Sequence, residues 1–513
     1  MKRFALSVVF LSSLTLASAQ APKAGSKALR FGAPAAITSG RLKTHLEFIA
    51  DDLLEGRDTP SRGLDIAALY ISSQLKLWGV QPAGDNGTYF QNMSMTVPKL
   101  DTAKTVLTIG DKTLHATTDF DAFLPAAAAT GDVEYVGYGF RAPSKGIDPY
   151  AGRDVKGKIL LVLAGMPKEL PREELFSGKI PDAEFPVDAA QKLGAKAIMI
   201  LAQPGQFPMM RMGGIPTIIL KPSAVTAMLE GTTLSPDELF RRGRQSDPGA
   251  SSTLAKTVAL TISSTNETYT YKNVVGKIAG SDPKLKEEYV AFGAHYDHVG
   301  KRGDGPGDTI WNGADDDGSG TVAILEIAHA FATGPRPKRS SLFVWHAGEE
   351  KGLWGSDYFV EHPTVPLKNI VTQLNIDMIG RSRAPGDTKP ANANLADGNS
   401  IYVIGSRKLS DELGDTIVAV NKNMMKLNLD YKYDDPKDPE HFYERSDHYN
   451  YARKGIPIAF FFNGVHEDYH GAGDEVSKID FVRMEKVTRT VYGIGWTVAN
   501  TIARPKVNKP VQN

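Results

Sequence analysis

Histidines and carboxylates that can bind metal ions recur in five short stretches of the second half of the sequence. These stretches are AHYDH (294–298), NGADDDGSG (312–320), AGEE (347–350), NIDM (375–378) and HEDYHGAGDE (466–475). The chain contains no cysteine, so a metal site must use imidazole and carboxylate ligands. That ligand set favours zinc-like metals of borderline softness over thiolate-bound ones.

Apolar runs typical of buried strands precede four of these stretches. YVAFGA leads into His295, SLFVWHA into Glu349 and Glu350, VTQLNI into Asp377, and IPIAFFF into the loop that holds His466 and His470. The aspartates 315–317 instead precede a dense apolar helix, GSGTVAILEIAHAFAT. Because ligands bind outside the carboxyl ends of the strands in parallel α/β sheets, we expect these groups to converge there.

Strands that alternate with helices from residue 258 onward predict an α/β fold with a central, mostly parallel mixed sheet flanked by helices. Residues 125–250 show several short strands and two helices, which predict an inserted, smaller β-rich domain. We assign residues 38–124 with 251–505 to the main domain, 20–37 to a loose leader and 506–513 to a tail.

The first 19 residues have the features of a secretory signal peptide. Lys2 and Arg3 precede an apolar run, and Ala17-Ser18-Ala19 matches the cleavage pattern. We therefore expect a periplasmic or secreted protein, with no stable membrane insertion because no later segment has the length and apolarity of a span. The 513-residue chain carries 59 basic and 59 acidic residues, which argues against nucleic-acid binding. The sequence does not determine an oligomeric state.

The spacing of side chains within three of these motifs indicates how a metal site would be arranged. His295 and Asp297 point the same way on a strand, so Asp297 can orient the imidazole through its second ring nitrogen. His298 has no such partner and is expected to be peripheral. One of the three aspartates 315–317 can bridge two cations, although a helix cap is the simpler interpretation of that run alone. Glu349 and Glu350 diverge, so one can bind metal while the other remains a free base.

Six motifs in this order resemble the two-zinc exopeptidases that include secreted bacterial leucyl aminopeptidases and, more distantly, glutamate carboxypeptidase. They are AHYDH, NGADDDGSG, AGEEKGLWGS, LNIDMIGR, RSDHYNYARKGIP and DYHGAGDE. The inserted segment, with VKGKILLVLAG and AAQKLGAKAIMIL, resembles the protease-associated domain often found within that family. The resemblance implies the zinc exopeptidase fold for residues 38–120 and 258–503.

The resemblance also implies a role for each matching residue. His295 and Asp377 would bind one zinc ion, Glu350 and His470 the other, and Asp316 would bridge the two. Glu349 would be the general base, Asp297 would orient His295, and Tyr443 would donate to the oxyanion. The Gly471-Ala472-Gly473-Asp474 segment departs from the family pattern, in which Thr-Pro or a similar pair often stands before the aspartate.

The predicted function is therefore that of an exported zinc metallopeptidase that removes the N-terminal residue of peptides. A water held between the two ions would attack the peptide bond, with Glu349 as its base. Three alternatives stay open: a carboxypeptidase or another amide hydrolase on this scaffold, a single-zinc cyclising enzyme, and a non-catalytic binding protein. Basic residues around the pocket would favour the carboxypeptidase.

Overall fold

The computed structural model describes residues 31–123, 125–171, 174–175, 179–202, 214–302, 307–435 and 437–511. The predicted signal peptide and most of the predicted leader lie outside these residues. No helix within the described ranges is long and apolar enough to cross a bilayer. Two compact units divide the chain: the residues up to Ser94 together with those from Thr270 form the first, and Met95–Tyr269 forms the second.

The first unit is built on a mixed sheet with a parallel centre. Its strands are β1 (Gln81–Pro82), β2 (Phe90–Leu100), β11 (Ser264–Ile278), β12 (Tyr289–His295), β13 (Ser340–His346), β14 (Ile370–Ile376), β15 (Ser400–Ile404), β16 (Asn428–Asp430) and β17 (Ile458–Phe462). They are ordered β1-β11-β13-β12-β14-β17-β15-β16, with β2 also paired to β11. β13, β12, β14 and β17 run parallel, whereas β11 and β15 join this core antiparallel.

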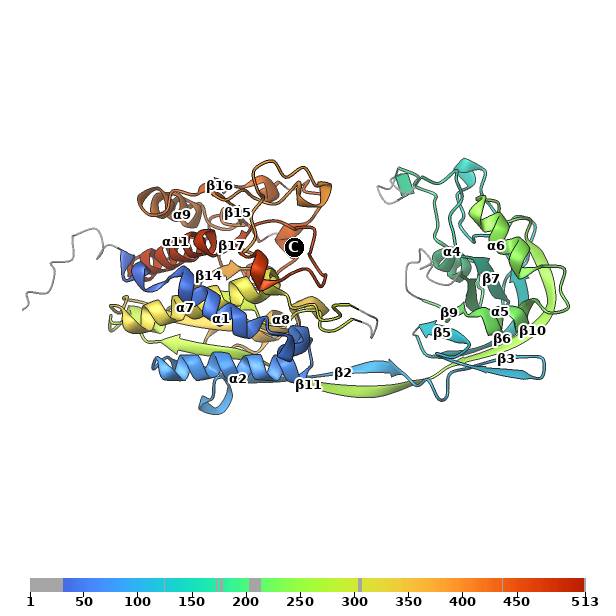
Figure 1. The fold of residues 1–513 in the computed structure, drawn as a ribbon, viewed down its shortest axis with the longest axis horizontal. Helices are drawn as coiled ribbons and strands as arrows, with labels where there is room; N and C mark the ends of the chain where they lie inside the picture. The colour runs from blue at the N-terminus through green and yellow to red at the C-terminus, as the bar shows by residue number, and fades with distance from the viewer. Residues whose placement is uncertain are drawn as a thin grey trace, which may run out of the picture. The chain divides into compact units, whose positions relative to one another are not determined.

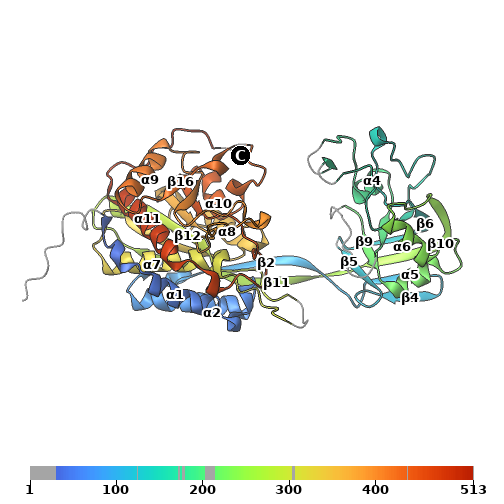
Figure 2. The ribbon, with the colours of Figure 1, turned by 45° about the horizontal axis from the view of Figure 1, so that its top comes forward.

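Helices cover both faces of this sheet (Figure 1). They are α1 (Ser39–Ile49), α2 (Arg62–Leu77), α7 (Gly320–Thr333), α8 (Trp354–Glu361), α9 (Asp411–Asn423), α10 (His448–Arg453) and α11 (Phe481–Asn500). α7 packs on the central strands with α1 and α11 beside it, while α8 contacts β13 and α10 contacts β14 and β17. The side-by-side arrangement of α1, α7 and α11 is also visible in the turned view of Figure 2.

Side chains of the central strands alternate between two buried faces. The face toward α7 and α11 holds a cluster of aromatic rings: Phe292, Phe331, Phe343 and Tyr492. The opposite face packs against α8 and α10 through Ala291, Leu342, Phe359 and Tyr451. Burial on both faces explains why these strands are continuous apolar runs in the sequence rather than alternating ones.

The register of the parallel strands brings their carboxyl ends to one edge. His295, the last residue of β12, pairs with His346, the last residue of β13. Ile376 at the end of β14 pairs with Phe461 of β17. The residues that follow these strands therefore meet at this edge, as the sequence predicts.

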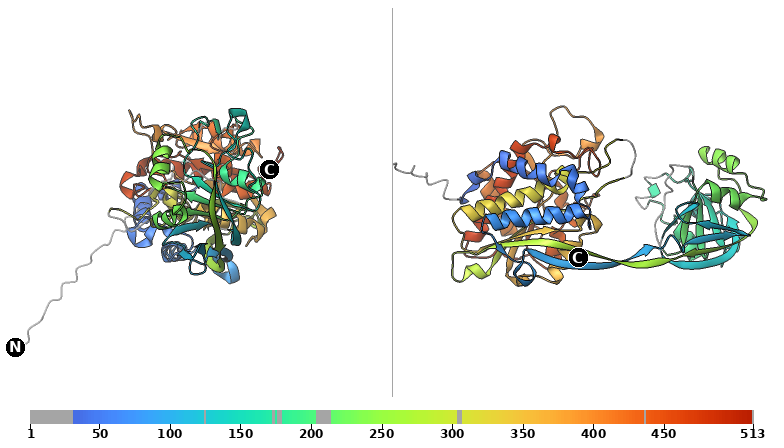
Figure 3. Two further views of the ribbon diagram at one scale, coloured as in Figure 1. Left: turned by 90° about the vertical axis from the view of Figure 1, so that its right-hand side faces the viewer. Right: turned by 60° about the horizontal axis from the view of Figure 1, so that its bottom comes forward.

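The second unit has its own sheet, ordered β4-β3-β10-β6-β7-β8-β9-β5, which is seen separately in Figure 3. Its strands are β3 (Val106–Ile109), β4 (Lys112–His115), β5 (Phe120–Phe123), β6 (Ala127–Tyr135), β7 (Ile159–Leu163), β8 (Ala197–Leu201), β9 (Thr217–Leu220) and β10 (Ser252–Ile262). Its helices are α4 (Pro186–Lys192), α5 (Pro222–Leu229) and α6 (Pro236–Arg244). Successive residues of β7 enter two different apolar clusters, so both faces of this sheet are covered.

This unit is longer at both ends than the segment 125–250 assigned from the sequence. β3, β4 and β5 precede residue 125, and β10 lies wholly after residue 250, yet all four strands pair within the second sheet. Residues 258–261 of β10 lie opposite residues 106–109 of β3. An alternating pattern identifies a strand but not the sheet it joins, because pairing between distant segments decides the sheet.

Candidate metal centre

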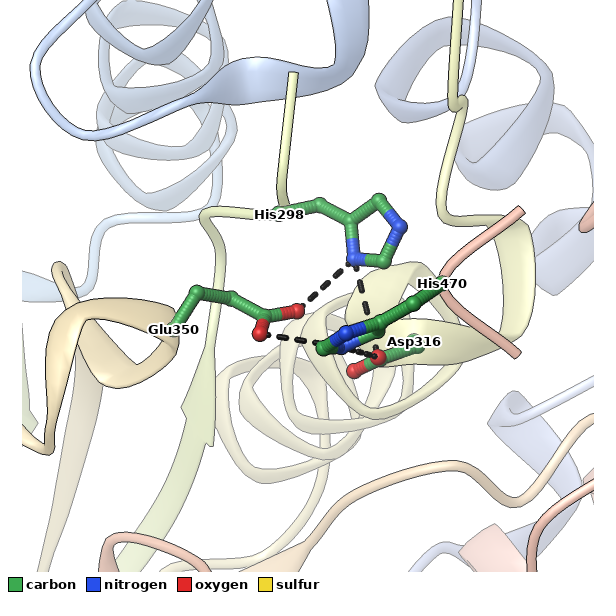
Figure 4. Close-up of side chains that lie close together, drawn as sticks. All are labelled: His298, Asp316, Glu350 and His470. Carbon is green, nitrogen blue, oxygen red and sulfur yellow. Dashed lines mark hydrogen bonds and ion pairs between the residues drawn. The ribbon is translucent and has the colours of Figure 1, made fainter. Parts of the chain in front are cut away.

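Two groups of possible ligands share Asp316 at the carboxyl edge of the parallel strands. One group consists of His295, Asp316 and Asp377, and the other of His298, Asp316, Glu350 and His470. Within each group the ligand atoms lie within 4.8 Å of one another, and Figure 4 shows the second group. The structure therefore brings the five predicted ligands together, and it places His298 among them rather than at the periphery.

Asp316 presents one carboxylate oxygen to each group. Its Oδ1 lies 3.4 Å from Nε2 of His295. Its Oδ2 lies 3.1 Å from Nε2 of His470 and 3.6 Å from Nδ1 of His298. This is the arrangement expected of a carboxylate that bridges two cations.

Asp297 lies behind His295, on the side away from Asp316. Nδ1 of His295 is 3.2 Å from the main-chain oxygen of Asp297 and 3.6 Å from its carboxylate Oδ1. That carboxylate also accepts hydrogen bonds from the Thr59 hydroxyl and the Glu349 main-chain N–H. Asp297 therefore occupies the Nδ1 side of the ring, which leaves Nε2 facing Asp316 and Asp377.

The spacing of these atoms fits divalent cations. Zinc with four nitrogen and oxygen ligands at about 2.0–2.1 Å separates neighbouring ligand atoms by about 3.3 Å. The distances between Asp316, Glu350, His298 and His470 in the second group run from 2.9 to 3.6 Å. Two of these buried atoms, Asp316 Oδ2 and His470 Nε2, make no hydrogen bond within the part of the chain that the structure describes, which is expected where a cation would satisfy them.

The pKa values of the ligands show how strongly this cluster attracts positive charge. Burial lowers the pKa of His470, but the neighbouring carboxylates of Asp316 and Glu350 outweigh that effect and raise its pKa to about 10. Burial opposes ionisation of Asp316, yet His295 and His470 hold its pKa well below the usual range. Bound cations would replace these protons, so metal binding here releases protons to the solvent.

The aspartates next to Asp316 accept hydrogen bonds from backbone N–H groups, and Asp315 Oδ2 also lies 3.3 Å from Nε2 of His466. Asp315 accepts a hydrogen bond from the Gly380 N–H, and Asp317 accepts from the N–H groups of His295, Gly320 and Met378. Asp474, in the loop that contains His470, accepts from the N–H groups of Asp315 and Asp316. These bonds connect the loops that carry the ligands and fix which of the three aspartates points inward.

Asp377 is oriented by a short relay of side chains. Its Oδ2 accepts a hydrogen bond of 2.7 Å from the Ser446 hydroxyl. Asn375 donates to that hydroxyl oxygen in turn, at 3.0 Å. Both partners are buried, so Asp377 has few alternative orientations and is presented to His295.

Glu349 and Glu350 point in different directions despite being adjacent. Glu350 faces His298 and His470, whereas Glu349 Oε2 lies 3.8 Å from Nε2 of His295. Glu349 lines the pocket beside the first group, and Glu350 is not among the lining residues. Burial raises the pKa of Glu349 well above its usual value, and Glu350 and Asp377 add to this against the effect of His295.

The pocket beside the first ligand group has a largely apolar wall. Its lining residues are His295, Asp316, Glu349, Asp377, Met378, Phe442, Arg445, Phe460, Phe462, Val465 and Tyr469. Arg445 is the basic residue among them, and its guanidinium lies over the Phe442 ring, 4.7 Å from the ring centre. Apolar side chains thus stand beside the carboxylates at this edge of the sheet.

The structure does not bring Tyr443 to this pocket. Its side chain is 6% exposed and packs in the apolar cluster under the sheet, while its neighbour Phe442 lines the pocket. A different tyrosine, Tyr469, lines the pocket and stacks on the ring of His470 with centroids 4.0 Å apart. The sequence signal that could have identified Tyr469 as a pocket residue is its position directly before the predicted ligand His470.

His448 fixes the main chain at Tyr443 and predicts an acid-sensitive stability. Nε2 of this buried histidine lies 2.8 Å from the Tyr443 carbonyl oxygen. Burial lowers its pKa to about 3, against the raising effects of Tyr443 and Asp447. Because the unfolded chain binds this proton near pH 6.5, the native state loses stability as the pH falls below 6.5, by about 2 kcal/mol at pH 5.

The matched variant is His448→Gln, whose amide can still donate to the Tyr443 carbonyl but does not titrate. Between pH 7 and pH 5 the unfolding free energy of the metal-free, unmodified chain should fall. In the His448→Gln variant we expect this fall to be about 2 kcal/mol smaller. Urea unfolding at both pH values measures this difference. Equal losses in the two proteins would contradict a depressed pKa at His448.

Arg57 is a fully buried cation that joins the loops around the site. Its guanidinium donates to four main-chain oxygens at 2.6–2.9 Å, those of Ile49, Tyr296, Asn312 and Gly313. Burial lowers its pKa to about 10, although the nearby carboxylates of Asp297 and Asp474 favour its charge. Arg57 thereby links the segment after His295 to the segment before Asp316.

Replacing Arg57 with methionine should destabilise the first unit by about 3 kcal/mol or more, because several buried carbonyls lose their donor at once. Urea unfolding of metal-free protein measures the loss. Arg57→Lys restores the charge with fewer donors in a different geometry, so it should recover only part of the stability. A loss below about 1 kcal/mol in Arg57→Met would show that other groups satisfy these carbonyls.

Histidine and carboxylate groups lie at the ends of parallel strands, with one carboxylate between two ligand groups and a glutamate outside both groups beside them. This arrangement suits metal-dependent hydrolysis. Comparisons with known proteins identify a related family. Residues 273–494, which lie in the first unit, match the family model of peptidase family M28. The resemblance read from the sequence is thus confirmed.

Curated relatives match over part of their length. The "Probable leucine aminopeptidase" of Trichophyton verrucosum is 28% identical over 229 residues, which are 42% of this chain and 56% of that protein. The "Probable zinc metalloprotease" of Pyrenophora teres f. teres is 35% identical over 128 residues, 24% of this chain and 26% of that protein. The chain thus spans little more than half the length of the Trichophyton verrucosum protein and about a quarter of the Pyrenophora teres f. teres protein.

Solved structures share the fold over almost the whole chain. The aminopeptidase from Aneurinibacillus sp. strain AM-1 aligns with a TM-score of 0.54 at 18% identity, covering 94% of this chain and 99% of that one. A zinc aminopeptidase from Bacillus subtilis aligns with a TM-score of 0.55 at 18% identity, covering 93% and 99%. The predicted α/β fold with a central, mostly parallel mixed sheet is confirmed.

Proposed function

We propose that the chain is an exported zinc aminopeptidase that hydrolyses the N-terminal peptide bond of peptides. The observation that carries this proposal is the geometry around Asp316, which faces two ligand groups while Glu349 stands free beside one of them. His295, Asp316 and Asp377 would hold one zinc ion, and Asp316, Glu350 and His470 the other. Bound zinc would polarise the peptide carbonyl and activate a water molecule.

Glu349 would accept the proton of the attacking water and return it to the leaving amine. Its carboxylate lies beside His295 and lines the pocket, so it can reach a substrate placed against the apolar wall. Its neighbour Glu350 is occupied by His298 and His470. This division leaves one of the two adjacent carboxylates available as a general base.

The apolar side chains of the pocket wall support a preference for substrates whose N-terminal residue has an apolar side chain. Met378, Phe462 and Val465 would bury it, and the largely apolar wall disfavours a charged side chain. Among the lining residues Arg445 alone is basic, and its guanidinium is held over Phe442. The alternative of a carboxypeptidase for acidic C-terminal residues would call for a cluster of basic groups at this wall.

Tyr469 is the tyrosine that we propose in place of Tyr443 as a donor to the developing oxyanion. It lines the pocket, its ring stacks on His470, and its hydroxyl lies 3.5 Å from Nη2 of Arg445. Burial raises the pKa of Tyr469 above its usual value, so its hydroxyl keeps its proton at neutral pH. A neutral hydroxyl there can donate to a developing negative charge.

The proposed activity is tested with a panel of aminoacyl amides, free and N-blocked, assayed with and without a chelator. We expect hydrolysis of the free amides of leucine, phenylalanine and methionine, little hydrolysis of aspartyl amide, and none of the blocked forms. Chelation should abolish the activity and zinc should restore it. Hydrolysis of C-terminal residues from N-blocked peptides would replace the aminopeptidase with a carboxypeptidase.

Export and the identity of the second unit complete the proposal. The predicted signal peptide supports a mature chain that begins at Gln20 in the periplasm or outside the cell, and N-terminal sequencing of the exported protein tests that start. The motifs within residues 125–250 support a protease-associated domain. An exported protein whose sequence still begins at Met1 would contradict cleavage of the signal peptide and weaken the export assignment.

A further inference from the structure

His298 is buried in the metal centre, where its Nδ1 faces two other members of the ligand cluster. Its side chain is fully buried, and its Nδ1 lies 2.9 Å from Glu350 Oε1 and 3.6 Å from Asp316 Oδ2. Its other nitrogen, Nε2, makes no hydrogen bond among the described residues. The cluster thus supplies the polar contacts that orient this ring, as Figure 4 shows.

The chain makes room for this imidazole through Gly313. A Cβ atom at that position would lie 2.4 Å from Cγ of His298, so any side chain there would displace the ring. Gly313 has a φ of 58°, a conformation that glycine adopts without strain. The loop before Asp316 is thereby shaped to admit the ring of His298 beside His470.

These contacts make the two ligand groups unequal. The group around Glu350 has four protein ligands, two of them imidazoles, which complete a tetrahedral set. The group around Asp377 has three ligands, one of them an imidazole, which leave one position open. Closed four-ligand sites hold zinc permanently, whereas three-ligand sites leave a position for water or substrate.

The pocket agrees with this division. All three residues of the smaller group, His295, Asp316 and Asp377, line it together with Glu349. His298, Glu350 and His470 are not among its lining residues. The open coordination position and the substrate pocket therefore belong to the same ligand group.

We propose that His298 is a sixth metal ligand and that it makes the two sites functionally distinct. The site formed by His298, Asp316, Glu350 and His470 binds its ion first and retains it. The site formed by His295, Asp316 and Asp377 binds its ion more weakly and presents it to the substrate. This inference rests on the proposed function only in that both require divalent cations at this centre.

The first test uses the unmodified full chain, freed of metal and titrated with zinc. Calorimetry should resolve a tight and a weaker binding event. X-ray absorption of the sample with one equivalent of zinc should show two imidazoles around the ion, and with two equivalents an average between one and two. A single imidazole at one equivalent, or two events of equal affinity, would overturn the proposal.

The second test separates a ligand from a hydrogen-bond donor. His298→Asn keeps an amide that can donate to Glu350 but removes the imidazole. We expect the tight event to weaken by about 100-fold or more, since even residues that only orient a ligand cost 10- to 100-fold when changed. A tight event within threefold of that of the unmodified chain would reduce His298 to a positioning residue and overturn the proposal.

Two matched histidine variants complete this design. His295→Asn should weaken the second event and spare the first, and the exposed His441→Asn should leave both unchanged. Cobalt absorption spectra of the same proteins report the coordination without relying on turnover. Unequal metal sites in a protein that cleaves no aminoacyl amide would refute the proposed function but not this inference, and absence of any zinc binding would refute both.

Discussion

Replacing Glu349 with glutamine is expected to lower turnover by about 10²–10⁴-fold while two zinc ions stay bound. The amide nearly preserves the volume of the side chain but cannot accept a proton from water. Glu349 belongs to neither ligand group, so the metal content should not change. Turnover of leucyl amide and zinc content, measured on the same preparation, provide the test.

The adjacent variant Glu350→Gln is the matched control and should behave differently. Glu350 contacts both His298 and His470, so its replacement should weaken one ion and the activity together. Zinc loss in Glu349→Gln with retention in Glu350→Gln would show that the two roles are exchanged. Near-normal turnover in Glu349→Gln would place the general base elsewhere.

Replacing Asp316 with alanine should weaken the binding of both ions, because its two oxygens face different ligand groups. We expect each affinity to fall by about 100-fold or more, and activity to disappear with the ions. Zinc content after dialysis against a buffered free-zinc concentration measures both losses.

Asp377→Asn is the control for this variant, since Asp377 belongs to one ligand group only. It should lose one ion and retain the other. If Asp316→Ala likewise kept one ion at the affinity of the unmodified chain, Asp316 would serve a single site and the two-ion arrangement would need a different bridge.

Much of the first unit was predictable because its signals are local. The buried strands of a parallel sheet are continuous apolar runs, so β12, β13, β14 and β17 could be located from the sequence. The spacing of apolar residues from about Ile479 to Ala503 predicts a helix, and the structure has α11 there, Phe481–Asn500. Apolar residues from about residue 38 onward also have helical spacing, and α1 there ends at Ile49. A short turn at Asp52–Arg57 follows it, in which Glu55 and Gly56 have positive φ angles.

Predictions that depend on distant pairing were less accurate. Residues 100–125 alternate like strands and were assigned with the main domain, but β3 and β5 pair with β10 and β9 in the second sheet. The sequence does not indicate a structural role for Arg57, since an arginine in a polar turn gives no sign that it is buried. Its role follows only from the four carbonyl groups that surround it.

The sequence by itself determined the chemistry available to this protein. The absence of cysteine, and histidines and carboxylates placed after apolar strands, specify a metal centre of imidazole and carboxylate ligands at one edge of a parallel sheet. These conclusions hold because residue type and strand periodicity are properties of short segments.

The tertiary structure alone decided which side chains face one another. His298 joins the ligands because the glycine loop before Asp316 admits its ring, and Tyr469 rather than Tyr443 lines the pocket. Asp316 turns inward because Asp315 and Asp317 are held by backbone groups of other strands. Such choices depend on contacts between segments far apart in the chain, and no local pattern encodes the direction in which a loop side chain points.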